Sequence, residues 1–538
     1  MDTRKRRQRV LVWLSLLACV LAACASSLYW FRADVSSGKA YTLSSAARTL
    51  YDEIPEQVRI TYFISPSLSD RHPGPGAIKD LLGELAAVSR GRIAFRSVDP
   101  SKDPSQADAF GVEPQQMQVV EKSEQRVALV YTGIVIEYLD RYHTIPAIID
   151  TATLEYETIK AVRALVRNRT QKAGLLLGDA DKTVENDYRY LASSLERAGY
   201  AVSQVQRGTD IPPDISVLLV LGNAALDRYD SWLVDSYLMR GGRVLFAVKG
   251  VDIQTAYGLN AKALPAGGFL GALESYGFVV QRELVLDRQN LTVPFQSASP
   301  SGAASISYVR YPHWIALDAR YANKDHPIST RFAGLDLYWP SPLELIQKPG
   351  LVYTELYKTS PGAWKQTKEL VTGPEYSSMY EQEQGLTTGQ YLVAASASGS
   401  FPSAFANGDL PSRDGMPALA PGLKASPDTR VVVFSCADFL TDLMEMSQSG
   451  FNASVAVAAT DWLSSEDDLI AIRSRAAIDP RLNRIDEPGT RSAMIALTYA
   501  VNLFLVPVAV IAFGVLRAWK KKRLESSARK EGRSGGEA

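Results

Sequence analysis

Two uncharged apolar runs, one near each end of the chain, are the strongest features of its hydropathy pattern. Residues 10–31 and 493–516 contain no Asp, Glu, Lys or Arg. The core of a bilayer is crossed by about 20 mainly apolar helical residues, and both runs meet that length. Asn502 and Pro507 interrupt the second run, but such residues are tolerated in membrane helices because neighbouring groups satisfy the backbone. The pattern therefore predicts two transmembrane helices.

Basic residues lie outside both runs. They are Arg4, Lys5, Arg6, Arg7 and Arg9 before the first run, and Arg517, Lys520, Lys521, Lys522 and Arg523 after the second. Because basic flanks stay in the cytoplasm, both termini are expected there, and residues from about Arg32 to Arg491 on the far side. This predicts a two-pass protein of a bacterial inner (cytoplasmic) membrane with a large periplasmic domain. As an alternative, Leu21-Ala22-Ala23-Cys24 resembles a lipobox, which would place a lipid on the Cys24 thiol.

The region 40–150 has the pattern of a small mixed sheet. Strand-like and helix-like segments alternate there: strand 58–64, helix 78–89, strand 92–98 and two further strands at 128–130 and 133–138. This order predicts a thioredoxin-like fold. The segment Ser65-Pro66-Ser67-Leu68 stands where that fold usually carries Cys-x-x-Cys, and thiol chemistry requires a thiolate. We therefore expect a binding platform and no oxidoreductase.

From residue 154 onward, strands separated by amphipathic helices predict a parallel sheet. The strands are 173–177, 200–206, 217–221 and 243–248; the helices are 154–166, 188–198 and 229–239; and helix 269–276 with strand 279–286 adds one more step. Such alternation is typical of right-handed βαβ units. The segments Gln296–Ser307 and Gly399–Thr429 are rich in small residues, Pro and Gly, and are predicted to be loops. Val431–Phe434 is expected to return to the sheet that begins near Ala173.

The predicted fold class is thus α/β, with a thioredoxin-like N-terminal domain and a flavodoxin-like parallel-sheet domain. The predicted organisation is a cytoplasmic tail at 1–9, a transmembrane helix at 10–31, the thioredoxin-like domain at 40–150, the α/β domain at 154–475 with a strand-rich or loop insertion at about 290–429, a second transmembrane helix at 493–516 and a cytoplasmic tail at 517–538.

Composition narrows the classes of partner. The 58 basic residues equal the 58 acidic ones, so nothing indicates a nucleic-acid partner. Of three cysteines, Cys19 and Cys24 lie in the first apolar run, which leaves Cys436 alone and predicts no disulfide framework.

Few residues are candidates for chemistry. Asp179 and Asp181 follow the strand 173–177, and ligands of α/β sheets bind at such strand ends, so both are weak candidates for ligand binding. The segment Gly178–Thr183 lacks the second Gly of a phosphate-binding Walker loop, and a solvated turn before a helix is the commoner interpretation. Cys436 follows a strand but has no flanking Gly, which favours a small buried thiol over a nucleophile. No two histidines have metal-ligand spacing, so we expect no metal, cofactor or catalytic residue.

Short motifs in a fixed order suggest a family. They are Ala40-Tyr41-Thr42-Leu43-Ser44, Val98-Asp99-Pro100, Gly241-Gly242-Arg243-Val244-Leu245, His326-Pro327-Ile328, Asp461-Trp462-Leu463 and Leu469-Ile470-Ala471-Ile472-Arg473. Together with the two apolar runs, they resemble the auxiliary, substrate-binding component of gliding-motility-type ABC transporters. The chain departs from that pattern in its Pro/Ser-rich insertion near Gly399–Thr429.

The resemblance implies a non-enzymatic extracytoplasmic subunit that works with a separate permease and ATP-binding subunit. It also implies an α/β domain related to glutamine amidotransferases without their nucleophile, and it supplies no binding residues. Two alternatives stay open: an envelope hydrolase that uses the strand ends near Asp179 and Cys436, and a scaffold that binds only protein.

Overall fold

The computed structural model describes residues 50–465 with short gaps. The gaps are 52–53, 70–72, 122–123, 149–153, 168–169, 256–257, 299–303, 331, 375–386 and 448–449, and the residues described beyond 465 are 492, 494, 497, 499, 508, 511–515 and 519. The chain divides into two units, Met1–Ile478 and Asp479–Ala538. The predicted span 10–31 and most of 493–516 lie outside the described residues. Within the described residues, no helix has the length and apolar character needed to cross a bilayer.

The N-terminal domain is a four-stranded sheet with helices. Its elements are β1 (Val58–Ile64), α3 (Pro66–Ser69), α4 (Pro73–Val88), β2 (Ile93–Val98), α5 (Pro104–Asp108), β3 (Gln115–Glu121), β4 (Glu124–Val130), β5 (Thr132–Tyr138), β6 (Arg141–Ile145) and α6 (Leu154–Arg167). The strand order is β2-β1-β5-β6, with β1 parallel to β2 and antiparallel to β5. Strands β3 and β4 form a separate hairpin.

One face of this sheet is covered by α4 and α6. Ile60 and Ile136 from the sheet, Leu82 from α4 and Ile159 from α6 share one buried apolar cluster. The helix-connected parallel pair β1–β2 followed by the antiparallel pair β5–β6 is the order from which we predicted a thioredoxin-like fold. That likeness itself stays a prediction.

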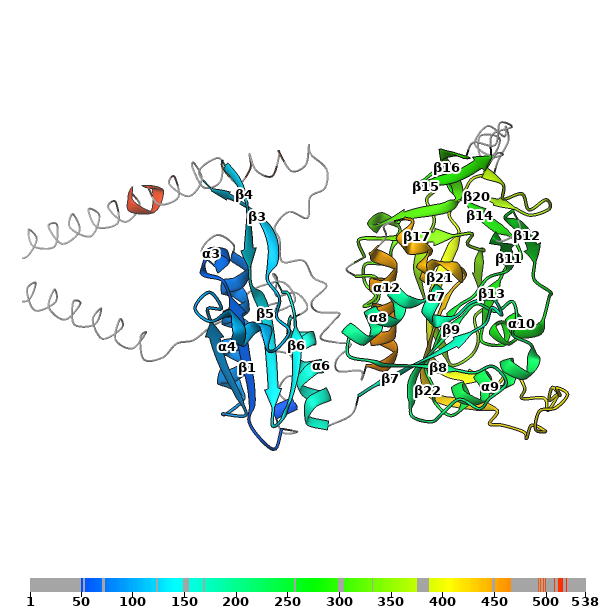
Figure 1. Cartoon of the computed structure of the whole chain (residues 1–538), viewed down its shortest axis with the longest axis horizontal. Coiled ribbons are helices and arrows are strands. Elements are labelled where there is room, and N and C mark those ends of the chain that lie inside the picture. The colour runs from blue at the N-terminus through cyan, green and yellow to red at the C-terminus, as the bar shows by residue number, and fades with distance from the viewer. Residues whose placement is uncertain are drawn as a thin grey trace, which may run out of the picture. The chain divides into compact units, whose positions relative to one another are not determined.

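The main domain is built on a seven-stranded sheet (Figure 1). Its strands are β7 (Lys172–Leu177), β8 (Ala201–Val205), β9 (Ile215–Leu221), β10 (Val244–Ala247), β19 (Leu351–Lys358), β21 (Leu392–Pro402) and β22 (Ala425–Phe434). The spatial order is β19-β21-β22-β10-β9-β7-β8. The five strands from β22 to β8 are parallel, whereas β21 and β19 are antiparallel to their neighbours. The predicted α/β class is confirmed, and β22 does return to the sheet that β7 begins.

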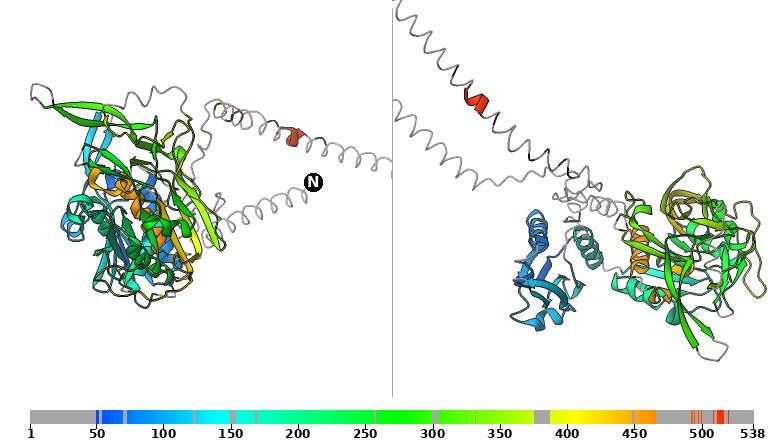
Figure 2. Two further views of the ribbon diagram at one scale, coloured as in Figure 1. Left: turned by 90° about the vertical axis from the view of Figure 1, so that its right-hand side faces the viewer. Right: turned by 90° about the horizontal axis from the view of Figure 1, so that it is seen from above.

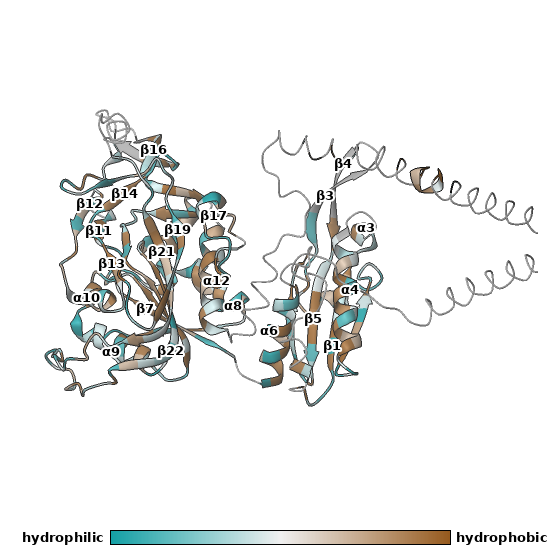
Figure 3. Cartoon of the chain, turned by 180° about the vertical axis from the view of Figure 1, so that it is seen from behind, coloured by the Kyte–Doolittle hydropathy of each residue, from teal (hydrophilic) through white to brown (hydrophobic). Residues whose placement is uncertain are grey.

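Helices cover both faces of this sheet. They are α7 (Val184–Asp187), α8 (Arg189–Arg197), α9 (Arg228–Met239), α10 (Gly268–Ser275) and α12 (Phe451–Ser464), with the short 3-10 helices η2 (Ala319–Tyr321), η4 (Asp438–Leu440) and η5 (Asp442–Glu445). Leu175 shares a core with α8 and α12, and its neighbour Leu176 shares a core with α9 and α10. Because successive strand residues point to opposite faces, a strand buried on both sides must be apolar throughout. Figure 3 accordingly colours much of β7 and β21 as hydrophobic.

Between α9 and β22 the chain builds a second, largely antiparallel region. Its strands are β11 (Val251–Gln254), β12 (Asn260–Ala263), β13 (Phe278–Val280), β14 (Leu284–Leu286), β15 (Asn290–Ala298), β16 (Ala304–Asp318), β17 (Gly334–Tyr338), β18 (Leu343–Leu345) and β20 (Trp364–Gln366). Its core is aromatic, with Trp314, Trp339, Trp364, Tyr311 and Tyr338 in one buried cluster.

Three expectations for the range 279–429 differ from the structure. The predicted strand 279–286 is two short strands, β13 and β14, which pair antiparallel with β18 and β20 outside the main sheet. The predicted loop 296–307 lies mostly in the β15–β16 hairpin, which projects from the domain in Figure 2. Strands β19 and β21 fall inside the predicted insertion, yet they belong to the main sheet.

Candidate functional site

The order of the parallel strands creates a crevice between β7 and β9. From β7 the chain passes through α8 to β8 on one side, and from β9 it passes through α9 to β10 on the other. The two connections therefore leave these neighbouring strands in opposite directions. In open α/β sheets, ligands bind outside the carboxyl ends of strands at such a point.

Two glycines let the loops that follow β7 and β9 touch. Gly178 N donates to Leu221 O at 2.7 Å, and Gly178 O accepts from Ala225 N at 2.7 Å. A Cβ on Gly178 would lie 1.9 Å from Gly222 O. Gly222 has a φ of 81°, and a Cβ there would lie 2.6 Å from the Asp179 carboxylate. Glycine at both positions therefore allows the contact and leaves room for Asp179 between the loops.

Asp179 is the centre of a buried group of charges. Its carboxylate accepts from Lys249 Nζ at 2.8 Å and from Ala224 N at 3.2 Å. Lys182 Nζ lies 3.4 Å from the same carboxylate and forms a shorter ion pair with Asp438. We call Asp179, Lys182, Lys249 and Asp438 the strand-end cluster. These residues follow β7, β10 and β22, so the cluster joins three strands at their carboxyl ends.

The loop after β9 supports the cluster through Asn223. Its Oδ1 accepts from Lys249 N at 2.8 Å, and its Nδ2 donates to Lys249 O at 3.1 Å. Lys249 Nζ also lies 2.7 Å from Asp252 Oδ1, whose side chain is partly exposed. Lys249 is thus held at its backbone by Asn223 and at its ammonium group by Asp179 and Asp252.

In the strand-end cluster, burial and the attraction between opposite charges shift the pKa values in opposite directions. Burial alone would lower the pKa of Lys182 and of Lys249, but attraction by Asp438 and Asp179 outweighs it, so both pKa values lie above their usual range. Burial alone would raise the pKa of Asp438, but Lys182 and Lys249 outweigh it and the pKa is lowered. Both lysines and Asp438 are therefore charged at neutral pH, and their charges are matched inside the cluster.

A polar cavity of about 520 Å³ opens beside the cluster. Its walls come from the ends of β7, β8 and β9 and from one distant loop: Leu177, Asp179, Ala180, Lys182, Gln204, Val205, Gln206, Arg207, Ala225, Asp227, Asp230 and Arg413. Arg413 belongs to that loop, and its Nε donates to Asp227 Oδ2 at 2.8 Å while its Nη2 pairs with Asp230. Asp227 and Asp230 also form the capping box at the start of α9. The Pro- and Gly-rich loop is thereby held against the cavity.

Cys436 lies near the cluster but is not a nucleophile in this state. Its side chain is fully buried, and Sγ donates to Tyr338 O at 3.1 Å. Burial, with the charge of Asp438, raises the pKa of the thiol to about 12. The thiol is therefore protonated at neutral pH, which agrees with the buried thiol favoured by the sequence. Among the described residues, no group of three His, Cys, Asp or Glu side chains could hold a metal ion.

The two predicted ligand residues lie in different surroundings. Asp179 is buried at the switch point, whereas Asp181 is exposed and lies outside the cluster. Sequence reasoning missed Asn223, Lys249 and Asp438. The rule that selected Asp179, a polar residue just after a buried strand, applies equally to Asn223 after β9 and Lys249 after β10. Asp438 follows β22 by a few residues and meets Lys182 only in the fold.

The fold and site define a doubly wound α/β protein with a polar crevice at its switch point. The chain belongs to the family described as an ABC-type uncharacterized transport system, whose model matches residues 170–465. The expected resemblance to an ABC-transporter auxiliary component is thereby confirmed, while its narrower gliding-motility type stays a prediction. A second model, a domain of unknown function (DUF7088), matches residues 37–137.

Relatives were found in sequence and in structure. An uncharacterized protein of Borreliella burgdorferi is 22% identical over 530 residues, which cover 95% of this chain and 97% of that protein. Crystal structures of putative ThuA-like proteins from Bacteroides uniformis and Parabacteroides merdae align with TM-scores of 0.28 and 0.27, at 11% and 10% identity. Each covers 55% of this chain and 91% of the other.

Exchanging the buried aspartate should cost far more stability than exchanging its exposed neighbour. Asp179→Asn removes the negative charge beside Lys249, and the buried ammonium group then keeps only Asp252 as a partner. The free energy of unfolding should fall by about 2–4 kcal/mol. Asp181→Asn should change it by less than about 0.5 kcal/mol, because the side chain is exposed. Urea unfolding of the full chain in mild detergent compares them, and equal effects would show that Asp179 is not paired as described.

The lowered pKa of Asp438 predicts an acid-dependent part of stability. A carboxyl group whose pKa is lower in the folded state than in the unfolded state stabilises the fold at pH values above its unfolded-state pKa. That contribution to the free energy of unfolding is lost as the pH falls below about 4. Asp438→Asn should therefore be less stable than the parent near neutral pH and should lose less stability between about pH 6 and about pH 3. Unfolding curves across that range test this, with Asp181→Asn as the control. Parallel pH profiles for the parent and Asp438→Asn would contradict it.

Proposed function

We propose that this protein is a non-enzymatic, membrane-anchored, extracytoplasmic auxiliary subunit of an ABC transporter, which binds a substrate or an envelope partner and works with a separate permease and ATPase. The observation that carries the proposal is the family match over residues 170–465, which includes the whole main domain.

The strand-end cluster favours binding over catalysis. A nucleophile or general base needs a group whose charge or lone pair is available to a substrate. Asp179 accepts from Lys249, Asp438 is paired with Lys182, and the Cys436 thiol is buried and protonated. An envelope hydrolase at these strand ends would have to break the ion pairs first. The cavity lined by Arg207, Arg413 and the edge of the cluster is instead suited to hold a polar ligand.

The N-terminal domain is proposed to be a thioredoxin-like platform for a binding partner. Its parallel β1–β2 pair, its β5–β6 pair and the covering helices α4 and α6 support this. Ser65 follows β1, where thioredoxins carry their thiols, and its Oγ accepts from Tyr131 N at 2.9 Å. The position thus serves the local fold rather than redox chemistry.

The two apolar runs support the membrane anchoring. The described residues between 493 and 516 are helical, and their larger apolar side chains are 50–68% exposed: Met494, Leu497, Tyr499, Val508, Ile511, Phe513 and Val515. An apolar helix surface of this kind is stable when lipid covers it. The basic flanks support cytoplasmic termini and a periplasmic main domain.

Recovery of transporter subunits would test the proposed role. After crosslinking in native membranes and solubilisation in mild detergent, a C-terminal affinity tag should recover a multi-span permease and an ATPase, identified by mass spectrometry. The same tag on an unrelated two-span membrane protein serves as the control. Recovery of envelope proteins without either subunit would favour the scaffold alternative and contradict the transporter role.

Labelling of introduced cysteines would test the topology. Leu423 is 57% exposed in the main domain, so Leu423→Cys should react with a membrane-impermeant maleimide in spheroplasts. Ser526→Cys, in the basic tail, should react only after lysis. The parent serves as background, because Cys436 is buried and Cys19 and Cys24 lie in the apolar run. The opposite pattern of labelling would contradict the proposed orientation.

A further inference from the structure

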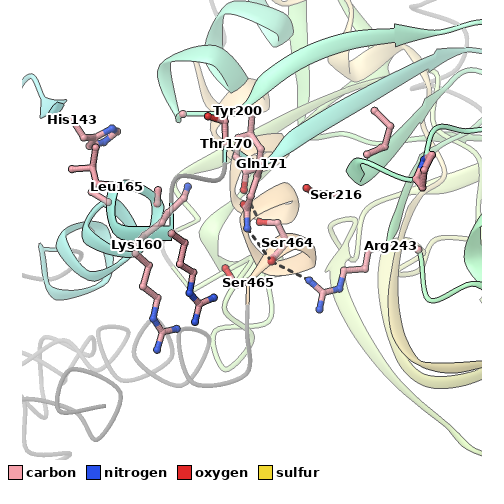
Figure 4. A pocket seen from close by; sticks show the side chains of 18 of the residues that line it. His143, Lys160, Leu165, Thr170, Gln171, Tyr200, Ser216, Arg243, Ser464 and Ser465 are labelled. Carbon is pink, nitrogen blue, oxygen red and sulfur yellow. Dashed lines mark hydrogen bonds between the residues drawn. The ribbon is translucent and has the colours of Figure 1, made fainter. Parts of the chain in front are cut away.

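Two cavities lie at opposite ends of the parallel strands, and their walls are built differently. The cavity at the amino ends has a volume of about 760 Å³, and in it Arg243 Nη1 and Gln171 Nε2 donate to Ser464 O at 3.0 and 3.3 Å (Figure 4). We call the cavity beside the strand-end cluster the strand-end cavity. It takes one lining residue, Arg413, from the long loop between β21 and β22. Part of its wall is therefore a loop and not an element of the sheet.

This loop is anchored at its base and has no buried residue beyond it. Ser403 N donates to Lys424 O at 2.9 Å, Ser403 Oγ donates to Asp235 Oδ2 at 2.7 Å, and Phe405 is buried. None of residues 406–423 is buried. We call these residues the strap, which Figure 1 shows in yellow beside α9. Because burial of apolar surface is the main source of local stability, the strap is held in place by other contacts.

The contacts of the strap are of two kinds. Among the described residues, its backbone–backbone hydrogen bonds join residues two or three positions apart, so they stabilise only local turns. The polar contacts that leave the strap go to the start of α9. Arg228 Nη2 lies 3.0 Å from Asp409 Oδ2, and the Tyr229 hydroxyl donates to Pro417 O at 3.1 Å. The strap is thus attached to the main domain at its base and at one further place.

Arg413 makes the strongest of the contacts with α9. Its Nε donates to Asp227 Oδ2 at 2.8 Å, its Nη2 pairs with Asp230, and its guanidinium lies 5.0 Å from the centre of the Tyr229 ring. Asp230 is buried, and charge-assisted bonds to a buried carboxylate are stronger than exposed ion pairs such as Arg228–Asp409. The position of the strap therefore depends mainly on Arg413.

The start of α9 keeps partners of its own when Arg413 is removed. Asp227 Oδ1 accepts from Tyr229 N at 2.8 Å and from Asp230 N at 3.1 Å. Asp230 Oδ1 accepts from Gly208 N at 2.8 Å. Both carboxylates are therefore still hydrogen-bonded without the strap, so release of the strap costs mainly the charged bonds of Arg413.

We propose that the strap is a gate over the strand-end cavity and that Arg413 is its latch. When the latch is closed, Arg413 forms part of the cavity wall. When it is released, the strap moves about its base at Ser403 and Lys424 and opens that wall to a ligand. Because Arg413 is partly exposed and Asp227 is exposed, salt weakens the latch. The gate regulates the site of the proposed function, on which it rests in that this cavity is taken to hold the ligand.

The reactivity of a cysteine in the cavity measures opening without a ligand. Ala225 lines the strand-end cavity, so Ala225→Cys is introduced into the full chain in mild detergent. Its reaction with an uncharged maleimide is followed by mass spectrometry of the peptide that contains residue 225. Adding Arg413→Gln should speed this reaction about tenfold, because charge-assisted hydrogen bonds are lost. Salt should speed it when Arg413 is present and not after Arg413→Gln.

A second variant separates release of the latch from the smaller size of glutamine. Asp227→Asn keeps an oxygen that caps α9 and leaves Arg413 intact but removes one charge of the latch, so it should also speed labelling, by a smaller factor. Arg320→Gln, which removes an exposed ion pair with Asp318, is the matched control and should leave the rate unchanged. Ser216→Cys in the amino-end cavity reports general loosening, and its rate should not respond to Arg413→Gln.

Two results would overturn the proposal. One is an equal labelling rate of Ala225→Cys with and without Arg413→Gln and Asp227→Asn. The other is faster labelling of Ser216→Cys as well, which would show that the whole domain has loosened. Neither result depends on transporter subunits, whose recovery tests the proposed function separately.

Discussion

A charge buried in a protein must have an opposite charge beside it, and this constraint organises the carboxyl end of the main sheet. Lys249 and Lys182 lie in a space closed by the loops after β7, β9 and β10, where an unpaired ammonium group would cost several kcal/mol. Asp179 comes from the loop after β7, and Asp438 comes from the loop after β22. Both lysines therefore have an acidic partner only when β22 is paired with β10. The cluster thus couples the chain between β10 and β22 to the strands β7, β8, β9 and β10.

The sequence predicted the parallel half of this sheet well, for a physical reason. Strands such as β7 and β9 are buried on both faces, so they are continuous apolar runs, and α8 and α9 have one apolar face each. The antiparallel strand β21 was missed because most of its residues are small. Strand β21 reads LVAASASGSFP and resembles a loop, yet its neighbours on both sides pair with its backbone. A Cβ at Gly399 would lie 2.1 Å from Gly350 O, so this strand needs glycine where β19 begins.

The candidate site was predicted only as far as local position determines it. Asp179 and Asp181 both follow the strand 173–177, and nothing in their immediate sequence separates a buried carboxylate from a solvated one. The difference arises from Lys249, 70 residues away, and from the close contact of Gly178 with Gly222. The Lys182–Asp438 pair joins residues 256 positions apart. Contacts over such separations depend on topology, which hydropathy alone does not supply.

Helix α9 connects the two ends of the sheet and shows how their different character arises. Asp227 and Asp230 stand at its start, and Arg240 stands at its end, which is the arrangement that the helix dipole favours. At the acidic end, Arg413 reaches in from a distant loop and neutralises both carboxylates. At the other end, Arg240 lies 3.6 Å from Asp210, whose side chain is 71% exposed. The same local preference thus places a buried, charge-matched group at the carboxyl end of the sheet and a solvent-screened ion pair at the amino end.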